Sequence, residues 1–257
     1  NITMVYADSP AEPLRFPEEA MDGSEHDIFA SSVQADWERT FEASSPSFQL
    51  EIQGIPLTFR YFKHSKYACA LMLGEVAKDE YGLLRQRLGP GDIVIDIGAN
   101  VGGVSIALAR LYPEVQVISL EPDPTLYRYL LWNLRANNAT SRVWPLNAGI
   151  CPAGEHATYT IMTPAGFIQR KDEVPCLSLA ELFALFHLDI VALLKIDCEG
   201  CEYSLFTSAS SDALFRRIRR LAGEIHRAPA GMPQDHVQRA RRFLCSPAAG
   251  SVVHGCK

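Results

Sequence analysis

The eight residues 195–202 concentrate ionisable side chains at the end of a predicted strand. They read Lys-Ile-Asp-Cys-Glu-Gly-Cys-Glu and overlap the end of an apolar run over 190–196. Charged groups at the carboxyl end of a central strand are costly unless they serve a ligand. Glu224 and His226 are two residues apart at the end of another predicted strand, 219–225, so they share one of its faces. Carboxylates and an imidazole in this setting can take a proton from a hydroxyl group or bind a divalent cation.

A second stretch, 92–103, has the pattern of a strand, a tight glycine turn and the start of a helix. It reads Asp-Ile-Val-Ile-Asp-Ile-Gly-Ala-Asn-Val-Gly-Gly, and an apolar helical segment continues to 111. The β-branched run Ile93–Ile97 suits a strand buried on both faces of a parallel sheet. Strand, turn and helix in this order point backbone N–H groups and a helix N-terminus at a ligand.

The details of this turn favour S-adenosylmethionine over a dinucleotide, although a turn that holds no ligand is the simplest alternative. In the dinucleotide pattern Gly-x-Gly-x-x-Gly, the second glycine approaches the pyrophosphate, and here Asn100 stands in its place. Asp96 would repel a pyrophosphate, whereas the ammonium and sulfonium groups of S-adenosylmethionine tolerate a nearby carboxylate. Glu121, after the next predicted strand, can accept hydrogen bonds from both ribose hydroxyls. The candidate cofactor contacts are Asp96, Gly98, Asn100, Gly102, Glu121, Pro122, Asn147, Ala148 and Asp197.

Hydrophobic periodicity predicts the elements that must position these residues. Apolar runs bounded by turn residues predict strands at 93–97, 116–120, 143–146, 157–162, 190–196, 219–225 and 251–254. Helical spacing predicts helices at 101–111, 124–134, 179–187 and 234–244, and a helical segment at 66–88 that Gly74 and Gly82 interrupt. The runs 48–52 and 57–62 alternate around Gly54 as a hairpin, and 163–172 is predicted to be a polar loop.

The composition and charge are those of a globular protein that is not built to hold nucleic acid. The chain of 257 residues has 47% hydrophobic residues and a mean hydropathy of −0.01, enough for a full core. Its net charge of −6 is opposite in sign to the basic surface that nucleic acid requires. No apolar run approaches the length of a membrane span, and no signal peptide is visible.

The cysteines are expected to be reduced thiols. There are seven, and an odd, scattered set in a chain of this size is typical of a reducing compartment. We therefore expect a cytoplasmic protein. Cys198 and Cys201 form a C-x-x-C motif, but no second pair with metal-ligand spacing accompanies it. These two residues are expected to be free thiols and dispensable.

Several of these blocks together resemble the FkbM family of S-adenosylmethionine-dependent methyltransferases, over about residues 48–246. The glycine block alone marks any class I methyltransferase, and the Lys-Ile-Asp-x-Glu-Gly-x-Glu block is the specific part. The family usually has an aliphatic and a small residue at Cys198 and Cys201, and Cys151 stands where an aspartate near the adenine is common. The blocks are DIGANVGGVSIALA (96–109), SLEPDPTLYRYLLWNL (119–134), NAG (147–149), KIDCEGCE (195–202) and GEIH (223–226).

The resemblance implies a Rossmann-like α/β fold of the class I methyltransferase type, with a mostly parallel central sheet and helices on both faces. The last strand of the family's seven-stranded sheet is not evident. We expect an N-terminal extension over 1–47 with a short helix at 33–42, and a hairpin and helical cap over the cofactor site in 48–88. The methyltransferase domain is expected to follow over 89–257. The family implies O-methylation of a small molecule, a sugar or natural product, without naming the acceptor.

Methyl transfer to a hydroxyl group needs an aligned sulfonium carbon and a base for the hydroxyl proton. The intrinsic pKa of histidine suits such a base, and His226 is expected to act in its neutral form. Asp197 and Glu199 are the alternative, as a carboxylate base or as oxygen ligands of a divalent cation. The simplest competing interpretation is an ion-pair network of Lys195, Glu199 and Glu202.

Two other kinds of protein remain open at this point. An RNA or nucleoside methyltransferase would be expected to carry an N/D-P-P-Y/F motif after the fourth strand, where KIDCEG stands instead. A non-catalytic protein could retain the fold as an S-adenosylmethionine-binding module. The expected partner is a small-molecule acceptor, with no nucleic acid and no membrane, and the oligomeric state is not predicted.

Overall fold

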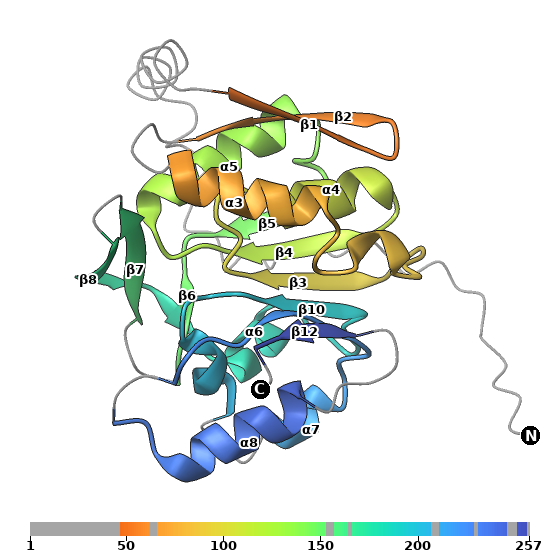
Figure 1. Cartoon of the computed structure of the whole chain (residues 1–257). Coiled ribbons are helices and arrows are strands. Elements are labelled where there is room, and N and C mark those ends of the chain that lie inside the picture. The colour runs from red at the N-terminus through yellow and green to blue at the C-terminus, as the bar shows by residue number, and fades with distance from the viewer. Residues whose placement is uncertain are drawn as a thin grey trace, which may run out of the picture.

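The computed structural model of the chain describes residues 47–61, 66–152, 157–163, 166–206, 211–228, 231–245 and 251–255 (Figure 1). The N-terminal extension up to residue 46 and the helix predicted at 33–42 lie outside the described residues. The predictions for that part of the chain are therefore not tested by the structure.

The described residues are organised around a central sheet of six strands. Every neighbouring pair in this sheet is parallel. The chain winds outward in opposite directions from β3 and β10, and ligands of open α/β sheets bind beyond the carboxyl ends of the strands at such a reversal. In spatial order the strands are β12 (Val252–His254), β11 (Leu221–Glu224), β10 (Leu193–Ile196), β3 (Ile93–Ile97), β4 (Gln116–Leu120) and β5 (Val143–Leu146).

Helices cover both faces of this sheet, as the sequence predicts (Figure 1). One face carries α3 (Lys66–Ala77), α4 (Gly103–Leu111) and α5 (Pro124–Ala136), and the other α6 (Leu179–Leu185), α7 (Ser211–Phe215) and α8 (Gln234–Leu244). Leu73 of α3 belongs to the same core cluster as Val94 of β3. The next residue of β3, Ile95, instead clusters with Leu182 and Leu244. Alternate residues of one strand thus supply two cores, which explains its continuous apolar run and confirms the predicted fold class.

An antiparallel hairpin, β1 (Ser47–Ile52) and β2 (Ile55–Arg60), is anchored to α5 by two asparagines. Asn137 accepts a hydrogen bond from the Thr58 N–H at 2.9 Å and donates one to the Thr58 carbonyl at 2.7 Å. Asn133, one helical turn earlier, makes the same pair of bonds to the backbone of Arg60, at 2.8 and 3.0 Å. The two side-chain amides bond the backbone of β2 as a neighbouring strand would. They therefore hold the predicted hairpin to the α/β domain.

The stretch 163–172 is not a loop, which corrects the sequence prediction. It contributes to β8 (Gly166–Val174), which pairs antiparallel with β7 (Ala157–Thr163). These two strands form a sheet of their own, and they satisfy each other's backbone hydrogen bonds. They are not part of the buried central sheet, so a polar composition is tolerated. The smaller elements are β6 (Gly149–Ile150), β9 (Cys176–Leu177) and the 3-10 helices η2 (Leu83–Arg85) and η3 (Cys201–Phe206).

Within the described residues Cys151, Cys176, Cys198, Cys201 and Cys245 are disulfide-bonded, so the expectation of free thiols is wrong. Cys151 is bonded to Cys176 across the parallel pair β6–β9, and Cys198 is bonded to Cys201 within the C-x-x-C motif. Their Cα atoms lie 5.8 and 5.5 Å apart, the usual separation for a disulfide. The number of cysteines does not reveal pairing, because pairing depends on which cysteines the fold brings together.

Replacing Cys151 and Cys176 together by alanine should lower the free energy of unfolding by about 3 kcal/mol. The disulfide closes a loop with a sequence separation of 25 residues, and the chain entropy of the unfolded state rises when that loop opens. Urea unfolding of the double variant, with and without reductant, measures the difference. If reduction destabilises the double variant as much as the wild type, this disulfide contributes nothing to stability.

Candidate active site

The predicted site residues meet at the carboxyl edge of the sheet. Ile97 pairs with Ile196 of β10 on one side and with Leu120 of β4 on the other. The residues that follow these three strand ends, Gly98, Asp197 and Glu121, are therefore brought to the same edge. Glu224 and His226 join them from the end of β11, whose Gly223 pairs with Ile196.

The glycine turn after β3 presses directly against the loop after β10. Gly98 has φ +79°, and a Cβ atom at this position would lie 1.8 Å from the carbonyl oxygen of Asp197. Only glycine can occupy the position, because the conformation is left-handed and the contact is with backbone. Lys195 reaches across from β10 and donates a hydrogen bond to the Gly98 carbonyl at 2.9 Å. The cofactor turn and the 195–202 stretch therefore form one structural unit.

Asp96 lies beneath this turn and is fully buried. One of its oxygens accepts a hydrogen bond from the Ser105 hydroxyl at 2.5 Å, and the other lies 3.3 Å from Lys195 Nζ. Burial lowers the pKa of Lys195, but the negative charges of Asp96 and Asp197 more than compensate and raise it, so Lys195 stays charged. Asp96 thus supports the turn from below, and its predicted contact with the cofactor stays a prediction.

Glu121, the predicted ribose ligand, is held at the sheet edge by backbone hydrogen bonds. Its two carboxylate oxygens accept hydrogen bonds from the backbone N–H groups of Asn100, at 2.7 Å, and Asp123, at 2.8 Å. The Asn147 side chain donates hydrogen bonds to the carbonyls of Glu121, at 2.8 Å, and Pro122, at 3.1 Å. Burial raises the pKa of Glu121 to about 7, although the two backbone hydrogen bonds lower it. The structure thus brings together four predicted cofactor contacts.

Glu121→Ala should weaken binding of S-adenosylmethionine by about 1–3 kcal/mol, the scale of losing charge-assisted hydrogen bonds. Isothermal titration calorimetry with S-adenosylmethionine and S-adenosylhomocysteine measures the change. Glu51→Ala is a control, because Glu51 is exposed on β1 and should leave the affinity unaltered. Binding of NAD in place of either compound would overturn the cofactor assignment.

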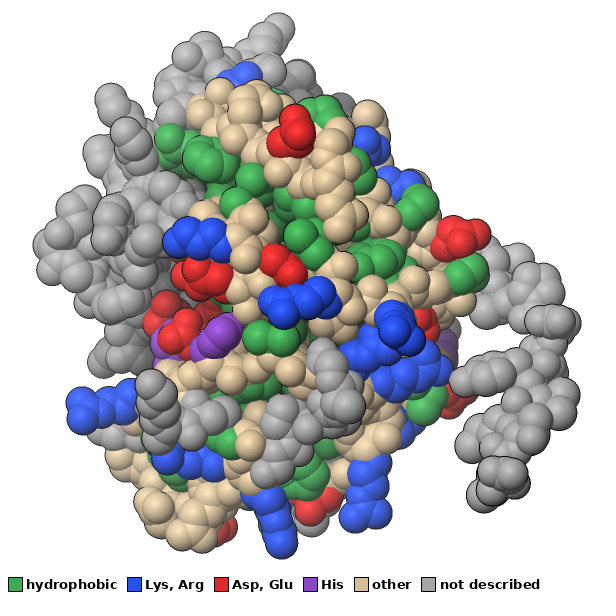
Figure 2. All heavy atoms as spheres, turned by 45° about the vertical axis from the view of Figure 1, so that its right-hand side comes forward, with side chains coloured by type: hydrophobic (Ala, Val, Ile, Leu, Met, Phe, Trp, Pro, Cys, Tyr) green, Lys and Arg blue, Asp and Glu red, His purple; other side chains and the backbone are tan. Residues whose placement is uncertain are grey.

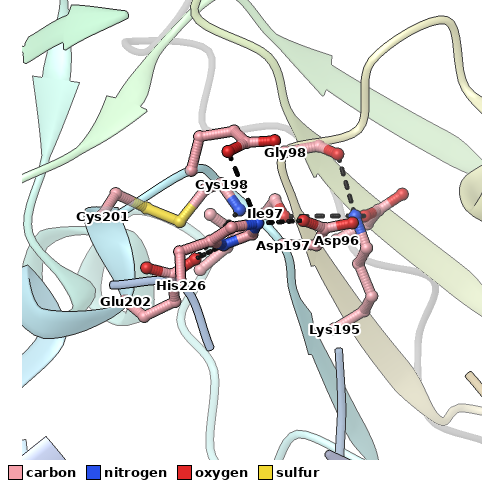
Figure 3. The surroundings of a disulfide bond; sticks show 10 residues. Asp96, Ile97, Gly98, Lys195, Asp197, Cys198, Cys201, Glu202 and His226 are labelled. Atoms are coloured by element: carbon pink, nitrogen blue, oxygen red, sulfur yellow. Dashed lines mark hydrogen bonds and ion pairs between the residues drawn. A yellow bond between two sulfur atoms is a disulfide. The ribbon is translucent and has the colours of Figure 1, made fainter. Parts of the chain in front are cut away.

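His226 is surrounded by carboxylates (Figure 3). Its Nδ1 atom lies 2.7 Å from Oε1 of Glu202, a residue that is completely buried. Its Nε2 atom lies 3.4 Å from Glu199 and 3.8 Å from Asp197, so the three predicted catalytic residues are close together. Burial lowers the pKa of His226, but the hydrogen bond and charge of Glu202, and the charges of Glu199 and Asp197, raise it to about 9. At neutral pH the imidazole is therefore mainly charged, not neutral as the sequence interpretation assumed.

Two residues from outside the sheet complete the site, and the sequence interpretation missed both. The Tyr81 hydroxyl lies 2.6 Å from Oδ2 of Asp197 and 2.9 Å from Oε2 of Glu75. A hydroxyl group donates only one hydrogen bond, so one of these contacts needs a proton on a carboxyl group. Burial raises the pKa of Glu75, and the nearby charge of Asp197 adds to this effect. The Tyr81 hydroxyl thus links Asp197 to Glu75.

The competing interpretation, an ion-pair network of Lys195, Glu199 and Glu202, is not what the structure shows. Lys195 pairs with Asp96, whereas Glu199 and Glu202 contact His226. A different trio has the spacing to hold a divalent cation: Asp197, Glu224 and His226 each offer a ligand atom, and these atoms lie within 4.8 Å of one another. This trio takes the place of the Asp197–Glu199 pair as the geometry on which the metal alternative rests.

The doubly wound parallel sheet, the glycine turn and the acid after β4 define a class I methyltransferase fold. A family model described as the methyltransferase FkbM domain matches residues 96–252. The chain belongs to this family, which confirms the resemblance inferred from the sequence blocks. The cofactor of the family, S-adenosylmethionine, is the one that the glycine turn predicts.

Two curated proteins are similar to parts of the chain. Methyltransferase sdnD of Sordaria araneosa is 32% identical over 91 residues, which are 35% of this chain and 34% of that protein. A tRNA(Phe) (4-demethylwyosine(37)-C(7)) aminocarboxypropyltransferase of Pyrococcus horikoshii is 30% identical over 101 residues, 38% of this chain and 35% of that protein. The chain thus matches about a third of the length of each relative.

Among solved structures, precorrin-6y C5,15-methyltransferase of Geobacter metallireducens is similar over 64% of this chain and 67% of that one. The sequence identity is 19% and the TM-score is 0.38. The family assignment rests on the family model and not on this likeness.

Proposed function

We propose that the protein transfers the methyl group of S-adenosylmethionine to a hydroxyl oxygen of a small molecule, a sugar or natural product. The observation that carries the proposal is the position of His226. Its Nε2 atom faces Asp197 and Glu199, at the sheet edge where the glycine turn and Glu121 would hold the cofactor. A proton acceptor therefore lies beside the expected place of the sulfonium group.

The reaction is an in-line displacement at the sulfonium carbon. The bond between oxygen and methyl carbon forms while the bond between sulfur and methyl carbon breaks, and the hydroxyl proton passes to His226 Nε2. The cofactor supplies the electrophile, so the protein must align the acceptor and take its proton. Glu202, Glu199 and Asp197 hold the pKa of His226 high in the free protein, and a bound sulfonium cation would oppose their charges and lower that pKa.

The hairpin and helical segment of 48–88 support the proposal of a cap over the site. Tyr81, which contacts Asp197, and Glu75, which contacts Tyr81, both come from this segment. The acceptor would then bind between Tyr81 on one side and His226 on the other. The proposed acceptor pocket is then on the cap side of the sheet edge.

An RNA or nucleoside acceptor is the second candidate, because one relative acts on tRNA by its name. The charges do not favour it: Asp197, Glu199 and Glu224 would repel phosphate groups at the site. On the face shown in Figure 2 the Lys and Arg side chains are scattered singly or in small groups, not gathered in one basic surface. We therefore place the small-molecule acceptor first.

The compartment is the point on which the structure weakens a sequence prediction. The cytoplasmic assignment rested on reduced thiols, and disulfides such as Cys151–Cys176 and Cys198–Cys201 are instead typical of an oxidising environment. Among the helices of the described residues, none combines the length and the apolar character needed to cross a membrane.

The test is a transfer assay with S-adenosylmethionine labelled in its methyl group, over hydroxylated sugars, lipids and phenols, with tRNA in parallel. We expect label in a small hydroxylated compound, with no loss of rate after treatment with EDTA. Label in tRNA alone would support the nucleic-acid alternative. Loss of rate with EDTA and recovery with Mg²⁺ would support the metal alternative at Asp197, Glu224 and His226. Cofactor binding with no transfer to any acceptor would support a binding module.

A further inference from the structure

Glu202 contacts Nδ1 of the His226 ring, whereas Asp197 and Glu199 lie near Nε2. It is completely buried, and its Oε1 atom lies 2.7 Å from His226 Nδ1. A carboxylate only accepts hydrogen bonds, so Nδ1 carries the proton and donates it to Glu202. In the neutral imidazole the lone pair is then on Nε2, the atom that faces Asp197 and Glu199. A single contact thus sets both the tautomer and the direction of the ring.

The backbone of His226 is held from the same element. The residue after Glu202, Tyr203, is completely buried, and its hydroxyl donates a hydrogen bond to the His226 carbonyl at 2.8 Å. Both contacts come from the start of η3. The ring of His226 therefore cannot turn without displacing a buried carboxylate.

A disulfide holds the start of η3 in its place. The bond between Cys198 and Cys201 closes the turn immediately before Glu202 (Figure 3). Within this turn Glu199 has φ +55° and Gly200 has φ +110°, both in the left-handed region. The Cys198 N–H group also donates a hydrogen bond to Oε1 of Glu202 at 3.4 Å. The disulfide thus stabilises a tight turn whose two ends bear Asp197 and Glu202.

We propose that Glu202 is the positioning residue of His226. We propose further that the Cys198–Cys201 disulfide fixes the turn that places Glu202 against the imidazole. The inference rests on the proposed function, since it gives His226 the orientation that a base requires. Glu202 acts through His226 and does not touch the acceptor. The groups that face the imidazole are Glu202 from η3, Asp197 and Glu199 from the loop after β10, and Glu224 from β11.

The first test compares Glu202→Gln with the wild type by ¹⁵N NMR of histidine-labelled protein. The signals of His226 are assigned by their loss in His226→Ala. In the wild type we expect the neutral ring to be protonated at Nδ1. In Glu202→Gln we expect a mixture of tautomers and a lower titration midpoint, because the buried negative charge is gone. Unchanged tautomer and midpoint in Glu202→Gln would overturn the inference.

Kinetics supply the second test. Glu202→Gln should lower kcat by about 10²–10⁴-fold with little change in KM, the range seen when a carboxylate that orients a functional histidine is neutralised. Glu202→Asp, which keeps the charge, should recover part of kcat. If His226→Ala is inactive while Glu202→Gln is fully active, the inference fails and the proposed function stands. If His226→Ala is active, the proposed function itself fails, whatever Glu202 does.

The disulfide is tested with a matched pair of double variants. Cys198→Ser with Cys201→Ser should disturb the Nδ1 signal of His226 in the same direction as Glu202→Gln. Cys151→Ser with Cys176→Ser removes the disulfide that joins the end of β6 to β9 and should leave that signal in place, because neither cysteine belongs to the turn that carries Glu202. Folding of both variants is checked by circular dichroism. An undisturbed signal in a folded Cys198–Cys201 variant would overturn the role of this disulfide.

Discussion

His226→Ala should lower turnover by roughly 10²–10⁴-fold, the usual share of general-base catalysis, while the affinity for S-adenosylmethionine barely changes. The reason is that the variant removes the group that takes the hydroxyl proton and leaves Glu121 and the glycine turn intact. Steady-state rates with the acceptor found in the transfer assay, together with calorimetry of cofactor binding, separate the two effects.

The control for this prediction is His187→Asn. His187 is exposed after α6 and has φ +49°, a conformation that asparagine tolerates, so the rate should be unaffected. The wild-type kcat/KM should rise as the pH increases toward about 9, because His226 must lose its proton to act and its pKa in the free protein is about 9. A nearly full rate in His226→Ala, combined with inactivation by a chelator, would replace the base assignment with the metal alternative.

Gly98→Ala should abolish cofactor binding and lower the free energy of unfolding by more than about 4 kcal/mol. The left-handed conformation alone costs an L-residue about 1–2 kcal/mol. The larger part comes from the contact, because the new Cβ atom would lie 1.8 Å from the Asp197 carbonyl oxygen and both strand ends would have to separate. Urea unfolding and calorimetry with S-adenosylhomocysteine measure the two losses.

Gly54→Ala is the matched control for Gly98→Ala. Gly54 has nearly the same φ, +78°, but a Cβ atom there would meet nothing within 4 Å. The control should therefore lose only the conformational part, about 1–2 kcal/mol, and should bind the cofactor normally. Equal losses in the two variants would show that the close approach of Gly98 to Asp197 is unimportant.

Strands that are apolar runs between clear turn residues are predicted well. The bounds of Ile93–Ile97, Gln116–Leu120 and Val143–Leu146 agree with the prediction. The strands β10 and β11 are shorter than predicted: β10 begins at Leu193 and β11 at Leu221. The strand Gly166–Val174 was missed because its pairing is with a neighbouring hairpin strand, and no apolar face reveals it.

At the site, residues that lie beside a glycine turn or a strand end could be predicted, and residues that arrive from elsewhere could not. His226, Asp197 and Glu199 follow two neighbouring strands, so their proximity comes from the topology of the sheet. Tyr81 is 116 residues away from Asp197 in the chain, and no spacing rule connects the two. The orientation of Glu202 toward His226 depends on the tight turn closed by the disulfide, which the sequence interpretation took to be two free thiols.

The most direct measurement is a crystal structure of the protein with S-adenosylhomocysteine. We predict that the ribose hydroxyls donate hydrogen bonds to Glu121 and that the sulfur atom lies on the His226 side of the Gly98 turn, within reach of an acceptor held by Nε2. S-adenosylhomocysteine bound elsewhere, or bound with its sulfur directed away from His226 and its ribose away from Glu121, would contradict the proposed site.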